Sequence, residues 1–288
     1  MVTTRIIGVV NVLNNIAVQS INFNKYLPIG KPEIAISFLN SWGIDEILVL
    51  DIKGYLKEKT NMFASLPDYV ANCHVPIAAG GGVKSLTDIE KLIRHGADKV
   101  VINSKSYENP KILEEGVKEF GQQAIIVSID VRNISKKYVA FSKSGSKRIN
   151  KSFESILKQA EEYGAGEIII NSIDKDGSKT GYDINLFDYV KKNVSIPVIG
   201  CGGVGTANHF LSGMKVGLSG LAAGNFFHFT EHSVIQLKRY LVKNKHNIRL
   251  DTYADYNGHE FSIDSRLSVL NEKKLDSLRY DYIPQEKI

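Results

Sequence analysis

The chain has 288 residues, of which 43% are hydrophobic and 23% charged, and its formal net charge is +5; this is the composition of an ordinary folded domain. No apolar run approaches the roughly 20 residues that cross a bilayer, and two cysteines cannot form a disulfide framework. The sequence also lacks a basic stripe interleaved with aromatic residues, so nucleic-acid binding is not expected. Without a signal-peptide pattern, we expect a cytoplasmic protein.

Short β-branched runs alternate with amphipathic segments along the chain. The runs lie at 5–12, 46–52, 75–80, 98–103, 123–130, 166–172, 196–201 and 218–223. Most are apolar on both faces, as parallel strands covered by helices require. Helical periodicity occurs at 31–42, 85–96, 109–121, 152–164, 185–193, 206–217 and 232–244. This alternation predicts a (β/α)8 barrel.

The second half of the chain repeats the first at an interval of about 120 residues. RIIGVVNV at 5–12 matches AIIVSIDV at 124–131, and VPIAAGGG at 75–82 matches IPVIGCGG at 196–203. A period this long is not that of a solenoid. We therefore expect one barrel domain over 1–250, built from half-barrels of about 1–120 and 121–250. A doubly wound open sheet would also alternate strands and helices, but it would not explain the repeat.

Two segments lie outside this pattern. Residues 132–150 are polar and predict a loop or small hairpin inserted after the fifth strand. Residues 251–288 form a charged, tyrosine-bearing C-terminal extension, with a short helix expected at 265–279. With little apolar periodicity, the extension could pack on the surface, bind a partner or stay partly disordered.

Glycines and small polar residues gather where the predicted strands end, which is the face of a barrel that carries chemistry. Gly82 ends the turn after the third strand and Gly203 the turn after the seventh, and each is followed one strand later by a polar end, Asn103-Ser104 or Gly224-Asn225. Backbone N–H groups in such turns can approach an anion, although either turn could simply be tight. Two equivalent turns predict a ligand with phosphate at both ends, or one working site and one relic.

Asp130 ends a strand that is otherwise apolar, and Asn11 occupies the equivalent position in the first half. A carboxylate there is either a structural hydrogen-bond acceptor or a general acid or base, and we favour catalysis. Asn11 cannot transfer protons in the same way. Asp51, at the end of the second strand, could hold a ribose hydroxyl or be structural.

The loop at 170–183, INSIDKDGSKTGYD, is the most polar segment on this face and contains Asp176 and Gly177. It could be a solvated charged loop, but its position and glycines favour a loop that closes over a substrate. At the opposite ends of the strands lie four charged residues, Arg5, Glu46, Lys99 and Glu167. They would have to be paired, so a salt-bridge cluster is the simplest interpretation. The histidines lack metal-ligand spacing, so we expect no metal and no cofactor.

Over about residues 4–250 the chain resembles the cyclase (synthase) subunit of imidazole glycerol phosphate synthase, a lyase-type enzyme that acts with a glutaminase. The shared motifs are DEILVLDI, ADKVVINS, SIDV and GAGEIIINSIDKDGSKTGYD, among others. The resemblance implies one phosphate site at Gly82, Asn103 and Ser104, and a second at Gly177, Gly203, Gly224 and Asn225.

The same resemblance changes the interpretation of the four charges. It implies that Arg5, Glu46, Lys99 and Glu167 form a gate for ammonia, delivered by a glutaminase docked at the N-terminal face of the barrel. Asp98 matches a position that contacts that glutaminase. Two positions depart from the family, which carries Asp at position 11 and Lys where this chain has Gln19.

A paralogous branch associated with surface-sugar gene clusters resembles this chain in lacking the first Asp. The resemblance therefore implies an ammonia-receiving barrel that serves acetamidino formation on a bacterial surface sugar, together with a third amidotransferase protein. One alternative is an active cyclase subunit of histidine biosynthesis. Another is a non-catalytic scaffold that activates a glutaminase.

Overall fold

The computed structural model describes residues 4–56, 62–254, 256, 259–262 and 265–268. Within these residues, eight parallel strands close into a barrel, because β12 pairs with β1 and β10 pairs with β7. The strands are β1 (Arg5–Leu13), β4 (Glu46–Asp51), β5 (Ile77–Gly80), β6 (Lys99–Ile102), β7 (Ile125–Ile134), β10 (Glu167–Ser172), β11 (Val198–Cys201) and β12 (Gly220–Ala223). The predicted (β/α)8 barrel is confirmed.

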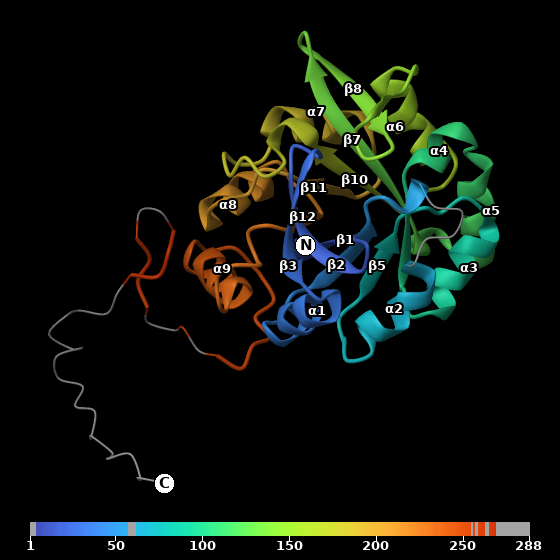
Figure 1. The fold of residues 1–288 in the computed structure, drawn as a ribbon. Coiled ribbons are helices and arrows are strands. Elements are labelled where there is room, and N and C mark those ends of the chain that lie inside the picture. Colours follow the sequence, from blue (N-terminus) through green and yellow to red (C-terminus); the bar gives the residue numbers. More distant parts are fainter. Residues whose placement is uncertain (1–3, 57–61, 255, 257–258, 263–264, 269–288) are drawn as a thin grey trace, which may run out of the picture.

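Helices surround the barrel in chain order, as Figure 1 shows. They are α1 (Pro32–Ser41), α2 (Met62–Val70), α3 (Leu86–Arg94), α4 (Ser104–Glu108), α5 (Lys111–Phe120), α6 (Phe153–Glu162), α7 (Ile184–Asn193), α8 (Ala207–Lys215) and α9 (Ser233–Lys243). The sequence did not predict α2, because Pro67 inside it interrupts the helical pattern. No helix in the described part of the chain is long and apolar enough to cross a membrane.

Apolar side chains fill the barrel interior. Because side chains alternate between the two faces of a strand, one set faces the helices and the other forms a compact inner cluster. The inner cluster is Ile7, Val9, Leu48, Ala78, Val101, Ile126, Ile169, Ile199 and Ala222. All are buried, and burying a large aliphatic side chain stabilises a fold by about 1.5–3 kcal/mol.

On two strands, β1 and β10, the same alternation places residues near both ends on the inward face. On β1, Arg5 and Asn11 have the same parity as Ile7 and Val9 of the inner cluster. On β10, Glu167 and Asn171 have the same parity as Ile169. The charged residues at the amino ends and the polar residues at the carboxyl ends therefore lie along common inward-facing rows.

A β-hairpin follows the first strand of each half. β2 (Ile16–Ile21) and β3 (Lys25–Gly30) extend β1, while β8 (Lys137–Ser142) and β9 (Lys147–Arg148) extend β7. The second hairpin fulfils the prediction for 132–150. The sequence analysis did not predict the first hairpin, where turns at Asn14-Asn15 and Asn22-Phe23 use left-handed backbone angles. The division into half-barrels stays a prediction.

The described part of the extension packs against α9. Tyr256 hydrogen-bonds with His232 at 2.7 Å, and the Phe261 ring packs edge-on against Tyr240 with 5.2 Å between centroids. Phe261 and Leu267 form an isolated β-bridge. The helix predicted at 265–279 lies largely outside the described residues, and residues 265–268 are not helical.

Candidate active site

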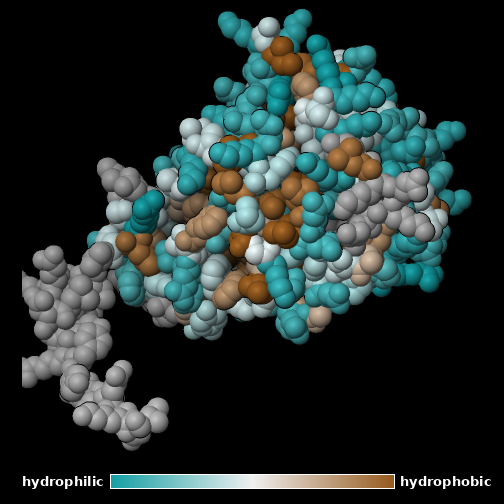
Figure 2. All heavy atoms as spheres, viewed as in Figure 1, coloured by the Kyte–Doolittle hydropathy of each residue, from teal (hydrophilic) through white to brown (hydrophobic). Residues whose placement is uncertain are grey.

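A cavity of about 370 Å³ opens at the carboxyl ends of the strands. Figure 2 shows hydrophobic residues gathered in the centre of this face, bordered by hydrophilic ones. The predicted site residues that line it are Asn11, Asp51, Gly82, Asn103, Ser104, Asp130 and Asp176. The predicted residues that do not line it are Gly177, Gly203, Gly224 and Asn225. The structure thus brings together one predicted phosphate set and the candidate proton-transfer position.

Asp130 lies in the cavity wall with only 5% of its surface exposed. Its carboxylate accepts hydrogen bonds from the side-chain amides of Asn171 at 2.9 Å and Asn103 at 3.0 Å. Burial raises the pKa of Asp130 to about 6, although these two hydrogen bonds act in the opposite direction. Both protonation states are therefore accessible near neutral pH, which suits a general acid or base.

Asn171 is a site residue that the sequence analysis missed. Its amide donates to the Ser128 hydroxyl at 3.1 Å as well as to Asp130. It pairs directly with Asp130 in the register of β10 and β7. The alternation of side chains along a strand could have predicted that Asn171 faces inward, because it lies two residues after Ile169 and four after Glu167, which both face inward.

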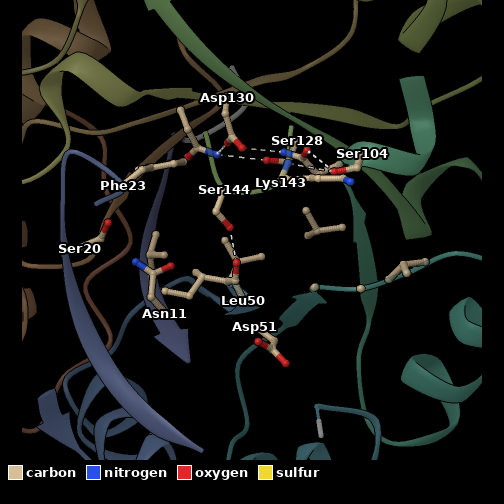
Figure 3. A pocket seen from close by; sticks show the side chains of 18 of the residues that line it. Asn11, Ser20, Phe23, Leu50, Asp51, Ser104, Ser128, Asp130, Lys143 and Ser144 are labelled. Carbon is tan, nitrogen blue, oxygen red and sulfur yellow. Dashed lines mark hydrogen bonds between the residues drawn. The ribbon is translucent and has the colours of Figure 1, made fainter. Parts of the chain in front are cut away.

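Asn11 and Asp130 lie on different walls of the same cavity (Figure 3). Within the described part of the chain, the Asn11 side chain makes no hydrogen bond. An amide can orient a substrate but cannot exchange a proton as a carboxyl group does. These two equivalent positions are therefore chemically different, because only the one in the second half-barrel, Asp130, can exchange a proton.

The turn after β5 forms one wall of the cavity together with the end of β6. Gly81 has φ of +116°, and a Cβ there would lie 2.3 Å from the backbone oxygen of Asp51, so only glycine fits. Asp51 itself is 7% exposed and accepts a hydrogen bond from the Lys53 N–H at 3.1 Å. Gly82, Asn103 and Ser104 meet here, in an arrangement that could hold an anion.

Two of the residues predicted for the second phosphate, Gly177 and Asn225, instead contact the β2–β3 hairpin. The Asn225 amide donates to the Ser20 carbonyl at 2.8 Å and its oxygen accepts from the Ser20 N–H at 3.3 Å. A Cβ on Gly177 would lie 2.8 Å from the same carbonyl. Gly203 accepts a hydrogen bond from the Gly181 N–H at 2.8 Å. Phosphate binding at this set stays a proposal, and it would require the hairpin to move away from Asn225.

The loop at 170–183 joins both hairpins through its carboxylates. Asp176 accepts hydrogen bonds from the Ser20 hydroxyl at 2.6 Å and the Phe23 N–H at 3.1 Å. Asp174 accepts from the Asn133 N–H at 2.8 Å. Burial raises the pKa of Asp176, and its hydrogen bonds oppose this rise. These two carboxylates therefore connect the loop to the hairpins, although Asp174 is also exposed to solvent.

We predict that Ser20→Ala loosens the β2–β3 hairpin. The change removes one hydrogen bond to a carboxylate, worth about 1.5 kcal/mol, so amide hydrogen exchange in the hairpin should accelerate roughly tenfold. The control is Ser135→Ala, which removes an exposed hydroxyl from the turn of the other hairpin. Unchanged exchange in Ser20→Ala would mean that the backbone contacts with Asn225 hold the hairpin alone.

At the amino ends of the strands, Arg5, Glu46, Lys99 and Glu167 form a closed set of ion pairs, here named the basal charge cluster. Arg5 contacts Glu46 and Glu167 at 2.5 Å each, and Lys99 contacts Glu46 at 3.1 Å and Glu167 at 2.8 Å. The Glu46 side chain is 3% exposed and that of Arg5 is 27% exposed. Each charge is thus matched by two opposite ones, as partly buried charges require.

The electrostatics of this cluster keep the Glu167 carboxylate ionised. Burial acts to raise the pKa of Glu167, but hydrogen bonds and charge from Arg5 and Lys99 outweigh it, so the pKa lies below its usual value. The predicted partner contact, Asp98, is exposed beside the cluster, and its carboxylate accepts a hydrogen bond from the Ile77 N–H at 2.8 Å.

Cys201 lines the cavity but is not poised as a nucleophile. Burial raises the pKa of its thiol to about 12, with smaller contributions from Asp176 and Asp130. The reactive thiolate is therefore scarce at neutral pH. Among the described residues, no group of His, Cys, Asp and Glu could hold a metal ion.

Comparison with known proteins gives a consistent result. A family model described as histidine biosynthesis protein matches residues 5–233. The imidazole glycerol phosphate synthase subunit HisF of Sulfolobus acidocaldarius is 37% identical over 250 residues, which is 87% of this chain and 100% of that protein. The same subunit of Hydrogenobaculum sp. is 39% identical over 254 residues, again 87% of this chain and 100% of that protein.

A third relative is the putative imidazole glycerol phosphate synthase subunit hisF2 of Vibrio vulnificus, which is 37% identical over 258 residues, or 89% of this chain and 94% of that protein. Each of these relatives exceeds 30% identity over nearly its whole length. The fold, a (β/α)8 barrel with its cavity at the carboxyl ends of the strands, agrees with this relationship. The chain therefore belongs to the family of HisF subunits of imidazole glycerol phosphate synthase.

Proposed function

We propose that this chain is the ammonia-using synthase subunit of an imidazole glycerol phosphate synthase-type complex, with a glutaminase as its partner. The observation that carries the proposal is the pairing of two features at opposite ends of the barrel interior. The basal charge cluster closes the amino ends of the strands, and Asp130 lies in the cavity at their carboxyl ends.

The residues between these features suit the passage of a small neutral molecule. Ammonia released at the basal face would have to pass Arg5 and Lys99. A path between them would open only if their ion pairs with the glutamates rearranged. It would then cross the inner cluster, whose members include the small residues Ala78 and Ala222 and whose apolar side chains would exclude ammonium. This route ends at the cavity, where Asp130 can exchange a proton with the reacting groups.

The glutaminase would dock at the amino-terminal face. The Arg5 side chain is 27% exposed there, and Asp98 is exposed beside it. A docked subunit would remove the remaining water from the cluster and strengthen its ion pairs. Binding could therefore be coupled to the state of the gate.

Two acceptors of ammonia remain to be distinguished. The names of the relatives favour the nucleotide intermediate of histidine biosynthesis, which we therefore take as the first candidate. Acetamidino formation on a surface sugar, with a third amidotransferase protein, is the second candidate, and it depends on Asn11. That residue leaves one titratable group where the family resemblance implies two.

The test is a turnover assay with the chain, its cognate glutaminase and the aminoimidazole nucleotide of histidine biosynthesis. Formation of imidazole glycerol phosphate at ordinary enzyme rates would support the first candidate and exclude the second. Absence of turnover, with restoration in Asn11→Asp, would show that the missing carboxylate abolished this reaction and would support a different acceptor. Equal glutaminase stimulation by wild type and Asp130→Asn, without product from either, would support the third possibility, a non-catalytic scaffold.

A further inference from the structure

The turn between β8 and β9 reaches over the cavity. Its residues Lys143 and Ser144 line the cavity together with Ser104. The Lys143 N–H donates to the Ser104 hydroxyl at 3.3 Å, and the Ser144 hydroxyl donates to the Ile52 carbonyl. The turn is therefore attached to the ends of both β6 and β4, two strands of the opposite half of the barrel.

The backbone of this turn has left-handed angles, as do the hairpin turns at Asn14-Asn15, Asn22-Phe23 and Ser135-Lys136. Lys143 has φ of +53° and Ser144 has φ of +52°, left-handed angles that residues with a side chain seldom adopt. The contacts with Ser104 and Ile52 hold the turn against the ends of β6 and β4, and they fix the position of the Lys143 backbone at the cavity.

The Lys143 ammonium has no partner of its own. Within the described part of the chain it forms no hydrogen bond and no ion pair, and its side chain is half-buried in the cavity wall. Figure 3 shows Lys143 beside Ser104, on the wall that also carries Asp130. A partly buried cation without a counter-ion is unfavourable unless an anion arrives.

The three residues of the neighbouring anion site are themselves uncharged, although Lys84 and Lys105 also line the cavity. Gly82, Asn103 and Ser104 can supply only neutral donors, an N–H, an amide and a hydroxyl. A phosphomonoester carries a charge of about −1.5 to −2 at neutral pH and has three strong acceptor oxygens. Charge-assisted hydrogen bonds to such oxygens are roughly twice as strong as neutral ones.

We propose that Lys143 is a specificity-determining residue that binds the phosphate of a phosphomonoester held by Gly82, Asn103 and Ser104. The inference rests on the proposed function for the presence of a phosphorylated ligand, and it adds the group that selects a dianion over a neutral sugar. The second half-barrel thereby contributes the counter-charge to the phosphate site of the first.

The experiment measures ribose 5-phosphate and inorganic phosphate binding to the full chain by calorimetry. Lys143→Asn should weaken ribose 5-phosphate binding about tenfold, while Lys143→Arg should stay within about threefold of wild type, because it keeps the charge. Asn tolerates the left-handed angle at this position. In turnover assays, Lys143→Asn should raise KM and leave kcat nearly unchanged, since the lysine binds a part of the ligand that does not react.

The control is Lys136→Asn, which removes an exposed lysine with φ of +65° from the other end of the same hairpin, away from the cavity. Its phosphate affinity should match that of wild type. Equal affinities of Lys143→Asn and wild type, or an equal loss in Lys136→Asn, would overturn the inference. If the wild-type chain shows no turnover but Lys143→Asn still weakens phosphate binding, the proposed function fails and this inference stands.

Discussion

Asp130→Asn is expected to lower the kcat of the synthase reaction by a factor on the order of 10²–10⁴, the usual contribution of a positioned acid or base. The amide matches the shape of the carboxyl group but cannot exchange a proton. Asn103 and Asn171 both donate to Asp130, so the cavity is built around an acceptor at this position. The measurement is steady-state turnover with ammonia supplied at a constant concentration of its neutral form.

The pH dependence provides a second readout of the same residue. With the pKa of Asp130 raised to about 6, the wild-type rate profile should show an inflection near pH 6 that disappears in Asp130→Asn. The matched control is Asp188→Asn, since Asp188 is an exposed carboxylate paired with Lys192 at 2.5 Å. A profile with the same inflection in Asp130→Asn would assign the titration to another group and contradict the proposed role.

The same shift makes a prediction for stability. The carboxyl group of Asp130 has a higher pKa folded than unfolded, so its contribution to the free energy of unfolding is complete below the unfolded pKa, near 3.8. That contribution is lost as pH rises through about 6, by roughly 3 kcal/mol. Asp176, whose pKa is also raised, acts in the same direction. The fall in Tm between about pH 4 and 6 should therefore be smaller in Asp130→Asn than in wild type.

Arg5→Met should lower the free energy of unfolding by about 3 kcal/mol, because it leaves Glu46 and Glu167 with Lys99 as their remaining counter-ion. Urea denaturation at neutral pH measures this change. The pKa of Glu167 is depressed in the folded protein, so its stabilising contribution is present at neutral pH and lost on acidification. The acid-induced loss of stability should consequently be smaller in Arg5→Met.

The matched control is Arg94→Met, which breaks an exposed pair with Glu90 at 2.6 Å whose side chains are 75% and 42% exposed. Surface pairs of this kind contribute 0–1 kcal/mol. If both variants lose the same small amount, the basal charge cluster contributes little to stability. On the proposed function, Arg5→Met should also reduce glutamine-dependent turnover more than turnover with added ammonia, since only the first uses the gate.

The sequence by itself determined the barrel, because hydrophobic pattern and repeat are local properties of the chain. Apolar runs separated by amphipathic segments leave few other ways to bury both faces of the strands. It also located Asp130, Asn103 and Ser104 in the cavity, since parallel strands bring their carboxyl ends to one face. Strand parity alone could have added Asn171, which faces inward two residues after Ile169.

The tertiary structure decided what distant residues do to one another. Nothing near Asp176 or Asn225 in sequence indicates that both bind Ser20, because the β2–β3 hairpin is placed on them only by the closure of the barrel. Nor does the polar segment 132–150 show that Lys143 reaches Ser104 on the opposite half. Local propensity fixes where strands occur, whereas the contacts of their loops depend on closure, which is a property of the whole chain.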